Sequence, residues 1–128
     1  MSEVRRVLIV DDDESIRLLL RRILESNPAI ETTLAEGCNE ALQLATEHVF
    51  HLILLDLLMP GVGGIEVLNQ IRKSSLNATT PVIIISVMSD QDTKIVCRSL
   101  GARDYLVKPI DRNAVLAAVA AQIGAAAH

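Results

Sequence analysis

Residues 7–13 read Val-Leu-Ile-Val-Asp-Asp-Asp, a short apolar run that ends in three acids. Three further apolar runs are also followed by a residue with a functional side chain: 52–55 by Asp56, 82–85 by Ser86, and 105–107 by Lys108, with Pro109 next. Short apolar runs bounded by turn residues are typical of buried parallel strands. In an open parallel sheet, sites form outside the carboxyl ends of the strands. The sequence therefore predicts one rim that carries acids, a hydroxyl and an ammonium group, which suits a divalent cation and a phosphoryl group.

Strand and helix patterns alternate along the whole chain. The first helical pattern places Ile16, Leu19, Leu20 and Ile23 on one face. The expected strands are 7–10, 30–35, 52–55, 82–85 and 103–107, each followed by a helix. Five such units imply right-handed crossovers and helices on both faces of one sheet.

The polarity of the strands predicts their order. The first, third and fourth strands are the most apolar and should be central, whereas 30–35 and 103–107 carry charged or hydroxyl residues and should be edges. The order 2-1-3-4-5 satisfies this pattern and gives a flavodoxin-like (βα)5 three-layer sandwich. Its switch point lies between the first and third strands, where Asp11, Asp12 and Asp56 should meet.

Local signals predict several helix ends. Ser89 and Asp92 have the spacing of a capping box at the start of the fourth helix. Gly101 is expected to end that helix in the left-handed conformation, and Asp111 to cap the last helix. An acid after a strand is often only an N-cap, so Asp13 is expected to be a cap or to face solvent.

Composition narrows the class of protein. The 128 residues are 50% hydrophobic and 2% aromatic, which predicts a single aliphatic-core domain over 1–124 and a frayed tail at 125–128. The net charge of −4 argues against direct binding of nucleic acid. No signal peptide or membrane-spanning run is apparent, and the lone Cys38 and Cys97 are expected to be reduced thiols in a cytoplasmic protein.

The acids, the hydroxyl and the lysine predict a specific chemistry. Three crowded carboxylates favour a cation among them, and Mg²⁺ prefers oxygen ligands. Asp56 follows an apolar strand and precedes a Pro/Gly loop, so it is the candidate nucleophile for an aspartyl phosphate. Lys108 can pair with this carboxylate and then with phosphoryl oxygens, and the Ser86 hydroxyl can donate to the same group.

Three other residues have competing interpretations. His48 and His51 have a metal-like spacing but lack a third ligand, which favours a surface or capping role. Tyr105 suits either packing at the sheet edge or a conformational switch.

The chain resembles the receiver domain of two-component response regulators, of the chemotaxis-regulator type. The matching residues are Val10-Asp11-Asp12, Asp56 with Met59-Pro60 and Gly64, Ser86, and Asp-Tyr-Leu-Val-Lys-Pro at 104–109. The similarity covers nearly the whole chain, and the combination is specific.

The resemblance implies a magnesium site made by Asp12 and Asp56, with Asp11 acting through water and the backbone carbonyl of Leu58 as a further ligand. It implies that Asp56 is the phosphoacceptor of a histidine kinase or a histidine phosphotransfer protein. Such a domain is not an enzyme with a separate substrate, but catalyses its own phosphorylation and dephosphorylation.

The resemblance further implies a switch in which the Ser86 hydroxyl moves toward the phosphoryl group and the Tyr105 ring turns inward. It also leads us to expect a cis peptide between Lys108 and Pro109, since X-Pro bonds tolerate that isomer.

The chain departs from the family pattern at three places. Gly63 stands where an acid is common, and Val87 stands where alanine or glycine is usual. Leu58 and Met88 are both apolar and offer no side-chain hydrogen bond to an attacking water. No catalytic group is missing, so these departures concern rates.

Several alternatives remain at this point. A haloacid dehalogenase-type phosphatase fits the spacing of Asp11 and Asp13 but needs a later acidic pair, and a flavodoxin-like electron carrier would not place three acids beside a flavin phosphate. A degenerate receiver that acts as a phosphate-independent interaction module is the main alternative, because Val87 narrows the approach to Asp56. The output, a downstream protein target or an output domain of the same protein, is not specified, and the alanine-rich last helix is compatible with a homodimer or a partner surface.

Overall fold

The computed structural model describes residues 3–61, 63–73 and 76–124. The tail expected to fray, 125–128, and Val62 of the Pro/Gly loop lie outside these residues. Within the described ranges, none of the helices has the length and apolar character needed to cross a membrane.

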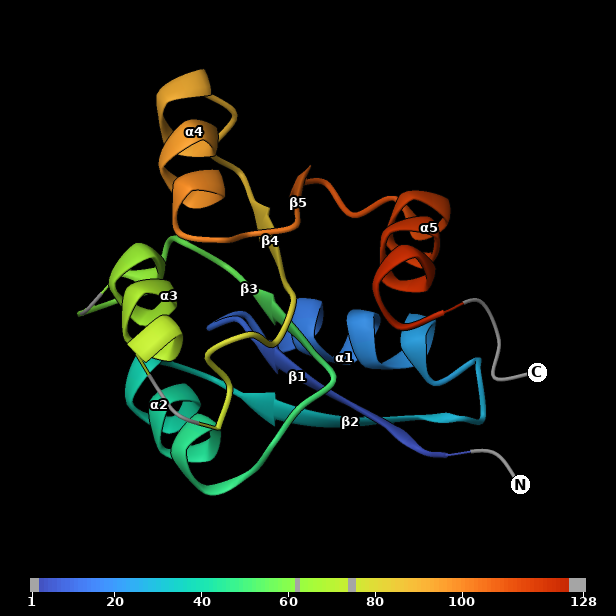
Figure 1. Cartoon of the computed structure of the whole chain (residues 1–128). Helices are drawn as coiled ribbons and strands as arrows, with labels where there is room; N and C mark the ends of the chain where they lie inside the picture. The colour runs from blue at the N-terminus through green and yellow to red at the C-terminus, as the bar shows by residue number, and fades with distance from the viewer. Residues whose placement is uncertain (1–2, 62, 74–75, 125–128) are drawn as a thin grey trace.

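Five parallel strands form one sheet in the order β2-β1-β3-β4-β5, which confirms the predicted topology (Figure 1). The strands are β1 (Arg5–Val10), β2 (Ile30–Ala35), β3 (Leu52–Leu55), β4 (Val82–Ser86) and β5 (Asp104–Val107). The helices are α1 (Glu14–Leu24), α2 (Cys38–Glu47), α3 (Gly64–Lys73), α4 (Gln91–Ser99) and α5 (Arg112–Ile123). In Figure 1, α1 and α5 lie on one side of the sheet and α2, α3 and α4 on the other.

The three central strands are buried on both faces, as their apolar sequences predict. Successive side chains alternate between the two faces, so Leu8 and Val10 pack in the core beneath α2 and α3, whereas Val7 and Ile9 pack beneath α1 and α5. β2 and β5 are the edges and carry the more exposed side chains. Cys38 and Cys97 are both buried, and neither is part of a disulfide.

Two of the predicted helix caps are confirmed and one is wrong. Asp13 and Asp111 cap α1 and α5 by accepting from Ser15 N and Ala114 N, respectively. The cap of α4 is Asp90 rather than Ser89: its carboxylate accepts from the backbone and the hydroxyl of Thr93. Asp90 has extended backbone directly before the first helical residue, which is the geometry an N-cap requires.

The buried face of α1 also differs from the predicted one. Leu19 is 38% exposed, whereas Leu20, Ile23 and Leu24 are buried. Arg17, which the predicted face did not include, is also buried. Its guanidinium is satisfied there by a backbone carbonyl, so a charged side chain can occupy an inward position.

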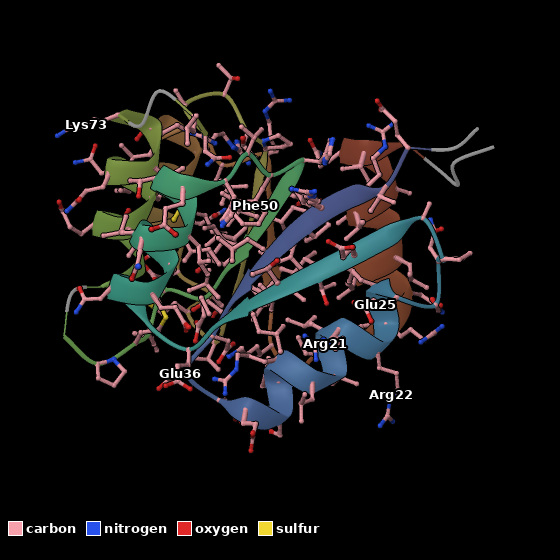
Figure 2. All side chains as sticks on the ribbon, turned by 90° about the horizontal axis from the view of Figure 1, so that it is seen from below. Arg21, Arg22, Glu25, Glu36, Phe50 and Lys73 are labelled. Carbon is pink, nitrogen blue, oxygen red and sulfur yellow. The ribbon has the colours of Figure 1, made fainter. Side chains whose placement is uncertain are left out.

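The last turns of α1 are bonded to the edge strand. Arg21 Nε donates to Thr32 Oγ1, and the backbone and hydroxyl of Thr32 both donate to Glu25. Figure 2 shows Arg21 in α1 and Glu25 just after its end, with the Arg22 side chain pointing away from the sheet. The hydrogen bonds to Thr32 lower the pKa of Glu25 below its usual value.

Arg72 joins the end of α3 to two loops at the amino-terminal edge of the sheet. Its guanidinium donates to five backbone carbonyls, those of Asn77, Ala78 and Thr80 before β4 and those of Leu100 and Gly101 after α4. Gly101 has φ +88°, so the predicted left-handed end of α4 is confirmed. A Cβ at Gly101 would also lie 2.8 Å from Arg72 Nε, so this turn needs glycine for two reasons.

Candidate functional site

The carboxyl ends of four strands bring the candidate residues to one rim. Asp11 follows β1, Asp56 follows β3, Ser86 closes β4 and Lys108 follows β5. Carboxylate oxygens of Asp11, Asp12 and Asp56 lie within 4.8 Å of one another. Asp11 and Asp56 are buried, whereas Asp12 is exposed and gives the group an open side. The geometry is that of a cation site made from oxygen ligands.

Lys108 lies against two of these acids. Its Nζ donates to Asp11 Oδ2 at 3.0 Å and to Asp56 Oδ2 at 3.4 Å. Burial by itself would lower the pKa of Lys108, but the hydrogen bond to Asp11 and the charges of both acids outweigh it and raise the pKa. Lys108 therefore stays an ammonium ion at neutral pH.

The surroundings of the Asp56 side chain disfavour its ionised form. Burial, followed by the charge of Asp11, raises the pKa of Asp56 above its usual value of 3.8. The Lys108 charge and the Leu58 N–H, which donates to Asp56 Oδ1 at 3.3 Å, offset this only in part. The carboxylate is thus weakly solvated and held by two donors, as befits a nucleophile.

The glycine loop after β3 packs closely on Asp56. A Cβ at Gly64 would lie 2.4 Å from the carbonyl oxygen of Asp56 and 2.6 Å from the Cα of Leu57. Only glycine permits α3 to begin this close to the acid.

The hydroxyl and the tyrosine of the expected switch meet at the backbone of Met88. The N–H of Met88 donates to Ser86 Oγ at 3.2 Å, and Tyr105 Oη donates to the Met88 carbonyl at 2.6 Å. Lys94 Nζ lies 5.7 Å from the centroid of the Tyr105 ring. Neither the part played by Met88 nor that of Lys94 was predicted, because these contacts depend on how α4 sits against β5.

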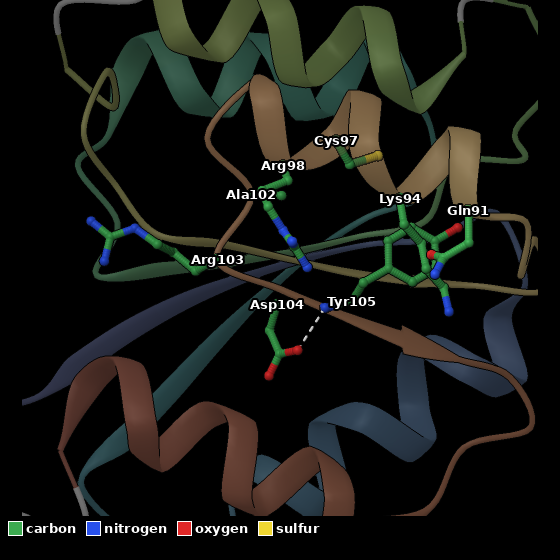
Figure 3. A pocket seen from close by; sticks show the side chains of 8 residues that line it. All are labelled: Gln91, Lys94, Cys97, Arg98, Ala102, Arg103, Asp104 and Tyr105. Carbon is green, nitrogen blue, oxygen red and sulfur yellow. Dashed lines mark hydrogen bonds between the residues drawn. The ribbon is translucent and has the colours of Figure 1, made fainter.

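A pocket between α4 and β5 lies beside this tyrosine (Figure 3). The Tyr105 ring forms part of its wall, and the cations of α4 point into it from the other side. The lining residues are Gln91, Lys94, Cys97, Arg98, Ala102, Arg103, Asp104 and Tyr105.

Three apolar residues lie close in sequence to Asp56 and Ser86. Leu58 is 51% exposed and Val87 57% exposed, and Met88 is half-buried. The backbone N–H of Leu58 contacts Asp56 and that of Met88 contacts Ser86, so these apolar residues adjoin two functional groups of the rim.

The remaining candidate residues have structural contacts. His51 Nδ1 accepts from the Arg6 N–H, and the His48 ring lies edge-on to Phe50. Asp13 is the α1 cap described above, and the peptide between Lys108 and Pro109 is cis. Among the described residues, the acidic trio is the group whose ligand atoms lie close enough together to hold an ion.

Comparisons with known proteins give a consistent result. The family model for the response regulator receiver domain matches residues 7–120. The transcriptional regulatory protein ResD of Bacillus subtilis is 40% identical over 117 residues, which are 91% of this chain and 47% of that protein. The response regulator ArlR of Staphylococcus saprophyticus is 35% identical over 118 residues, 92% of this chain and 52% of that protein. The chain thus spans about half the length of these curated relatives.

The solved structures resemble the chain over nearly its full length. The receiver domain protein (CheY-like) from Methanospirillum hungatei has a TM-score of 0.87 at 26% identity, covering 94% of both chains. The receiver domain of the Francisella response regulator 1452 has a TM-score of 0.84 at 34% identity, covering 93% of this chain and 96% of that one.

Proposed function

The chain belongs to the response regulator receiver domain family, and on that premise we propose that Asp56 is its phosphoacceptor. The observation that carries this proposal is the position of Asp56, buried at the end of β3, within reach of two further acids and in contact with the Lys108 ammonium. The expected donor is a histidine kinase or a histidine phosphotransfer protein, and the chain supports its own phosphorylation and dephosphorylation.

The transfer is a displacement at phosphorus. A carboxylate oxygen of Asp56 forms a bond to phosphorus while the bond from phosphorus to the donor histidine nitrogen breaks, and the imidazole takes a proton. The product is an acyl phosphate on Asp56. Lys108 contacts Asp56 before transfer and can contact a phosphoryl oxygen afterwards, since its shorter bond to Asp11 anchors it at the site.

The donor set of the rim fits magnesium. Receiver domains bind Mg²⁺ in their acidic site, and the three carboxylates here supply the hard oxygen ligands that this ion prefers. Asp12 and Asp56 would hold it directly, Asp11 through water, and the backbone carbonyl of Leu58 would complete the protein ligands. When bound, the ion supplies positive charge at the phosphoryl oxygens.

Ser86 and Tyr105 are proposed to report phosphorylation to the surface. The Ser86 hydroxyl is buried and bonded to the Met88 N–H, and Tyr105 is bonded to the carbonyl of the same residue. A movement of Ser86 Oγ toward the phosphoryl group would break the first of these bonds. The β4–α4 loop would then rearrange, and Tyr105 with it.

The wider role of the protein is likewise a proposal. We expect residues 1–124 to act as a single receiver domain in the cytoplasm, with a downstream protein target or an output domain of the same protein as its partner. A homodimer is a further expectation, based on the alanine-rich α5.

Asp56→Asn tests the assignment directly. An amide cannot act as the nucleophile, so we expect no labelling by acetyl phosphate, whereas the parent should be labelled at one site and only with Mg²⁺. Asp13→Asn is a matched control, because Asp13 is an exposed cap on the same rim and asparagine also caps helices well. Intact mass measurement gives the stoichiometry. Equal labelling of the Asp56 variant would refute the assignment, and an unlabelled parent would favour a phosphate-independent interaction module.

A further inference from the structure

A buried arginine lies directly behind the acid cluster. Arg17 of α1 is only 9% exposed, although buried charges are rare unless they are well paired. Its ion pair with Glu36 is long, at 3.7 Å, and the Glu36 side chain is 76% exposed. Figure 2 shows Glu36 near the start of α1. The short contact of Arg17 is a different one: Nη1 donates to the backbone carbonyl of Asp11 at 2.7 Å.

That carbonyl belongs to the peptide unit that joins Asp11 to Asp12. A peptide unit is planar and rigid, so holding its oxygen fixes the Cα atoms at both of its ends. One end carries the Asp11 side chain and the other carries the Asp12 side chain, two of the three acids in the cluster. A single hydrogen bond from Arg17 therefore restrains the backbone from which both carboxylates project.

The two neighbouring peptide units are also held. The Asp11 N–H donates to the Ala35 carbonyl at 3.2 Å, and the Asp13 N–H donates to Asp11 Oδ1 at 2.9 Å. The unit between them is the one that Arg17 holds. The side chain of Asp12 is exposed, so its position depends chiefly on this backbone.

We infer that Arg17 is a positioning residue that prepares Asp11 and Asp12 for magnesium by holding the peptide unit between them. The inference rests on the proposed magnesium site, since it assigns a role toward that ion. Two effects of Arg17 have opposite signs. The hydrogen bond to the Asp11 carbonyl favours binding by orienting the ligands, whereas the positive charge opposes it by repelling the cation. The inference states that orientation outweighs repulsion.

Magnesium affinity of the folded protein tests this inference. Arg17→Met keeps an unbranched apolar chain but removes the donors, and Arg17→Lys keeps a cation and an N–H donor. The matched control is Arg22→Met, which changes an exposed arginine on the same helix. Mg²⁺ is titrated alone against each protein, and the amide shifts of Asp12 and Asp13 are followed by NMR, with circular dichroism to show that each variant is folded.

We expect the magnesium dissociation constant to rise about tenfold in Arg17→Met, the size typical for loss of a group that orients metal ligands. Arg17→Lys should recover most of this affinity, and Arg22→Met should match the parent. If the methionine variant does not fold, Arg17→Leu, which also lacks a donor, takes its place with the same expectation. Unchanged or tighter binding in the methionine or leucine variant would overturn the inference, as would a lysine variant that binds as weakly as the methionine variant.

A failure of the underlying site would look different. If the magnesium site is correct, Asp12→Asn should bind Mg²⁺ much more weakly than the parent does. The amide shifts that Mg²⁺ changes in the parent should then centre on the acid cluster. If the parent shows no magnesium binding that depends on Asp12, the proposed magnesium site is wrong, and the role of Arg17 is wrong with it. If the parent binds and the Arg17 variants bind equally well, only the role of Arg17 fails.

Discussion

Replacing Asp56 by asparagine is expected to stabilise the metal-free protein, although it removes the proposed phosphoacceptor. Burial and the charge of Asp11 raise the pKa of Asp56 above 3.8. A raised pKa means that the ionised carboxylate is less favourable in the folded state than in the unfolded state. At neutral pH this effect lowers the free energy of unfolding of the parent. The neutral amide in Asp56→Asn carries no such penalty.

The magnitude follows from the contacts that survive. One unit of raised pKa corresponds to about 1.4 kcal/mol of unfolding free energy. The amide oxygen in Asp56→Asn can still accept from the Leu58 N–H, and Lys108 keeps its 3.0 Å bond to Asp11. Because few hydrogen bonds are lost, we expect the variant to be more stable by on the order of 1 kcal/mol.

The sign of the pH dependence is fixed by the direction of the shift. The penalty is present above the folded-state pKa of Asp56, because there the carboxylate is ionised in both states. As pH falls through that pKa the folded state binds a proton first, and the penalty has gone below the unfolded value of 3.8. The difference between variant and parent should therefore shrink as the solution becomes acidic.

Urea unfolding followed by circular dichroism measures this difference, with EDTA present to remove metal. Asp13→Asn again serves as the control. Hydrogen bonds with Ser15 lower the pKa of the exposed Asp13, so removing this carboxylate should not stabilise the folded protein. Adding Mg²⁺ should reverse the order, because a ligand that binds the folded state stabilises it, by about 2.7 kcal/mol at a hundredfold excess over its dissociation constant. An Asp56→Asn variant less stable than the parent in EDTA would refute the reasoning.

Three further predictions concern the phosphorylated protein. Lys108→Ala should leave the fold intact but slow phosphorylation and weaken phosphate-induced spectral changes, since it removes the cation that contacts Asp56; parent-like rates and spectra would contradict this role. The phosphate on Asp56 should be lost slowly, over minutes to hours, because the exposed apolar side chains of Leu58 and Val87 cannot orient an attacking water, and positioning a reactant is worth about several kcal/mol. The loss should be faster in Val87→Ala or Leu58→Asn. A parent that loses phosphate within seconds would contradict that shielding. Phosphorylation requires ionised Asp56, whose pKa is raised in the metal-free protein. At limiting Mg²⁺, the rate with a small donor should therefore fall on acidification at a pH above 3.8, and a rate independent of pH across that range would count against this reasoning.

The strand order and the meeting of the acids could be predicted because both depend on periodicity and polarity. Apolar strands become central and polar strands become edges, and parallel strands deliver whatever follows them to the same rim. Asp11, Asp12, Asp56 and Lys108 were placed by that rule alone.

The details that were wrong or missing depend on competition between neighbours. Ser89 and Asp90 are both good caps, and the backbone before α4 decides between them. Helical periodicity assigned Leu19 to the core because it is apolar, but it could not show that the Asp11 carbonyl lies opposite Arg17. The contact of Tyr105 with Met88 likewise depends on the seating of α4, which no local pattern describes.

The five hydrogen bonds from the Arg72 guanidinium to backbone carbonyls have a mechanical consequence for α4. They attach the turn at Leu100 and Gly101 to α3 and to the loop before β4, so the carboxyl end of α4 is a fixed point. The nine residues of α4 form a rod of about 13 Å, and a tilt of about 10° around that fixed end displaces the opposite end by about 2 Å. Any rearrangement of the β4–α4 loop is therefore largest at Gln91 and fades toward Ala102. Such a tilt would change the width of the pocket beside Tyr105 more at its Gln91 end than at its Ala102 end.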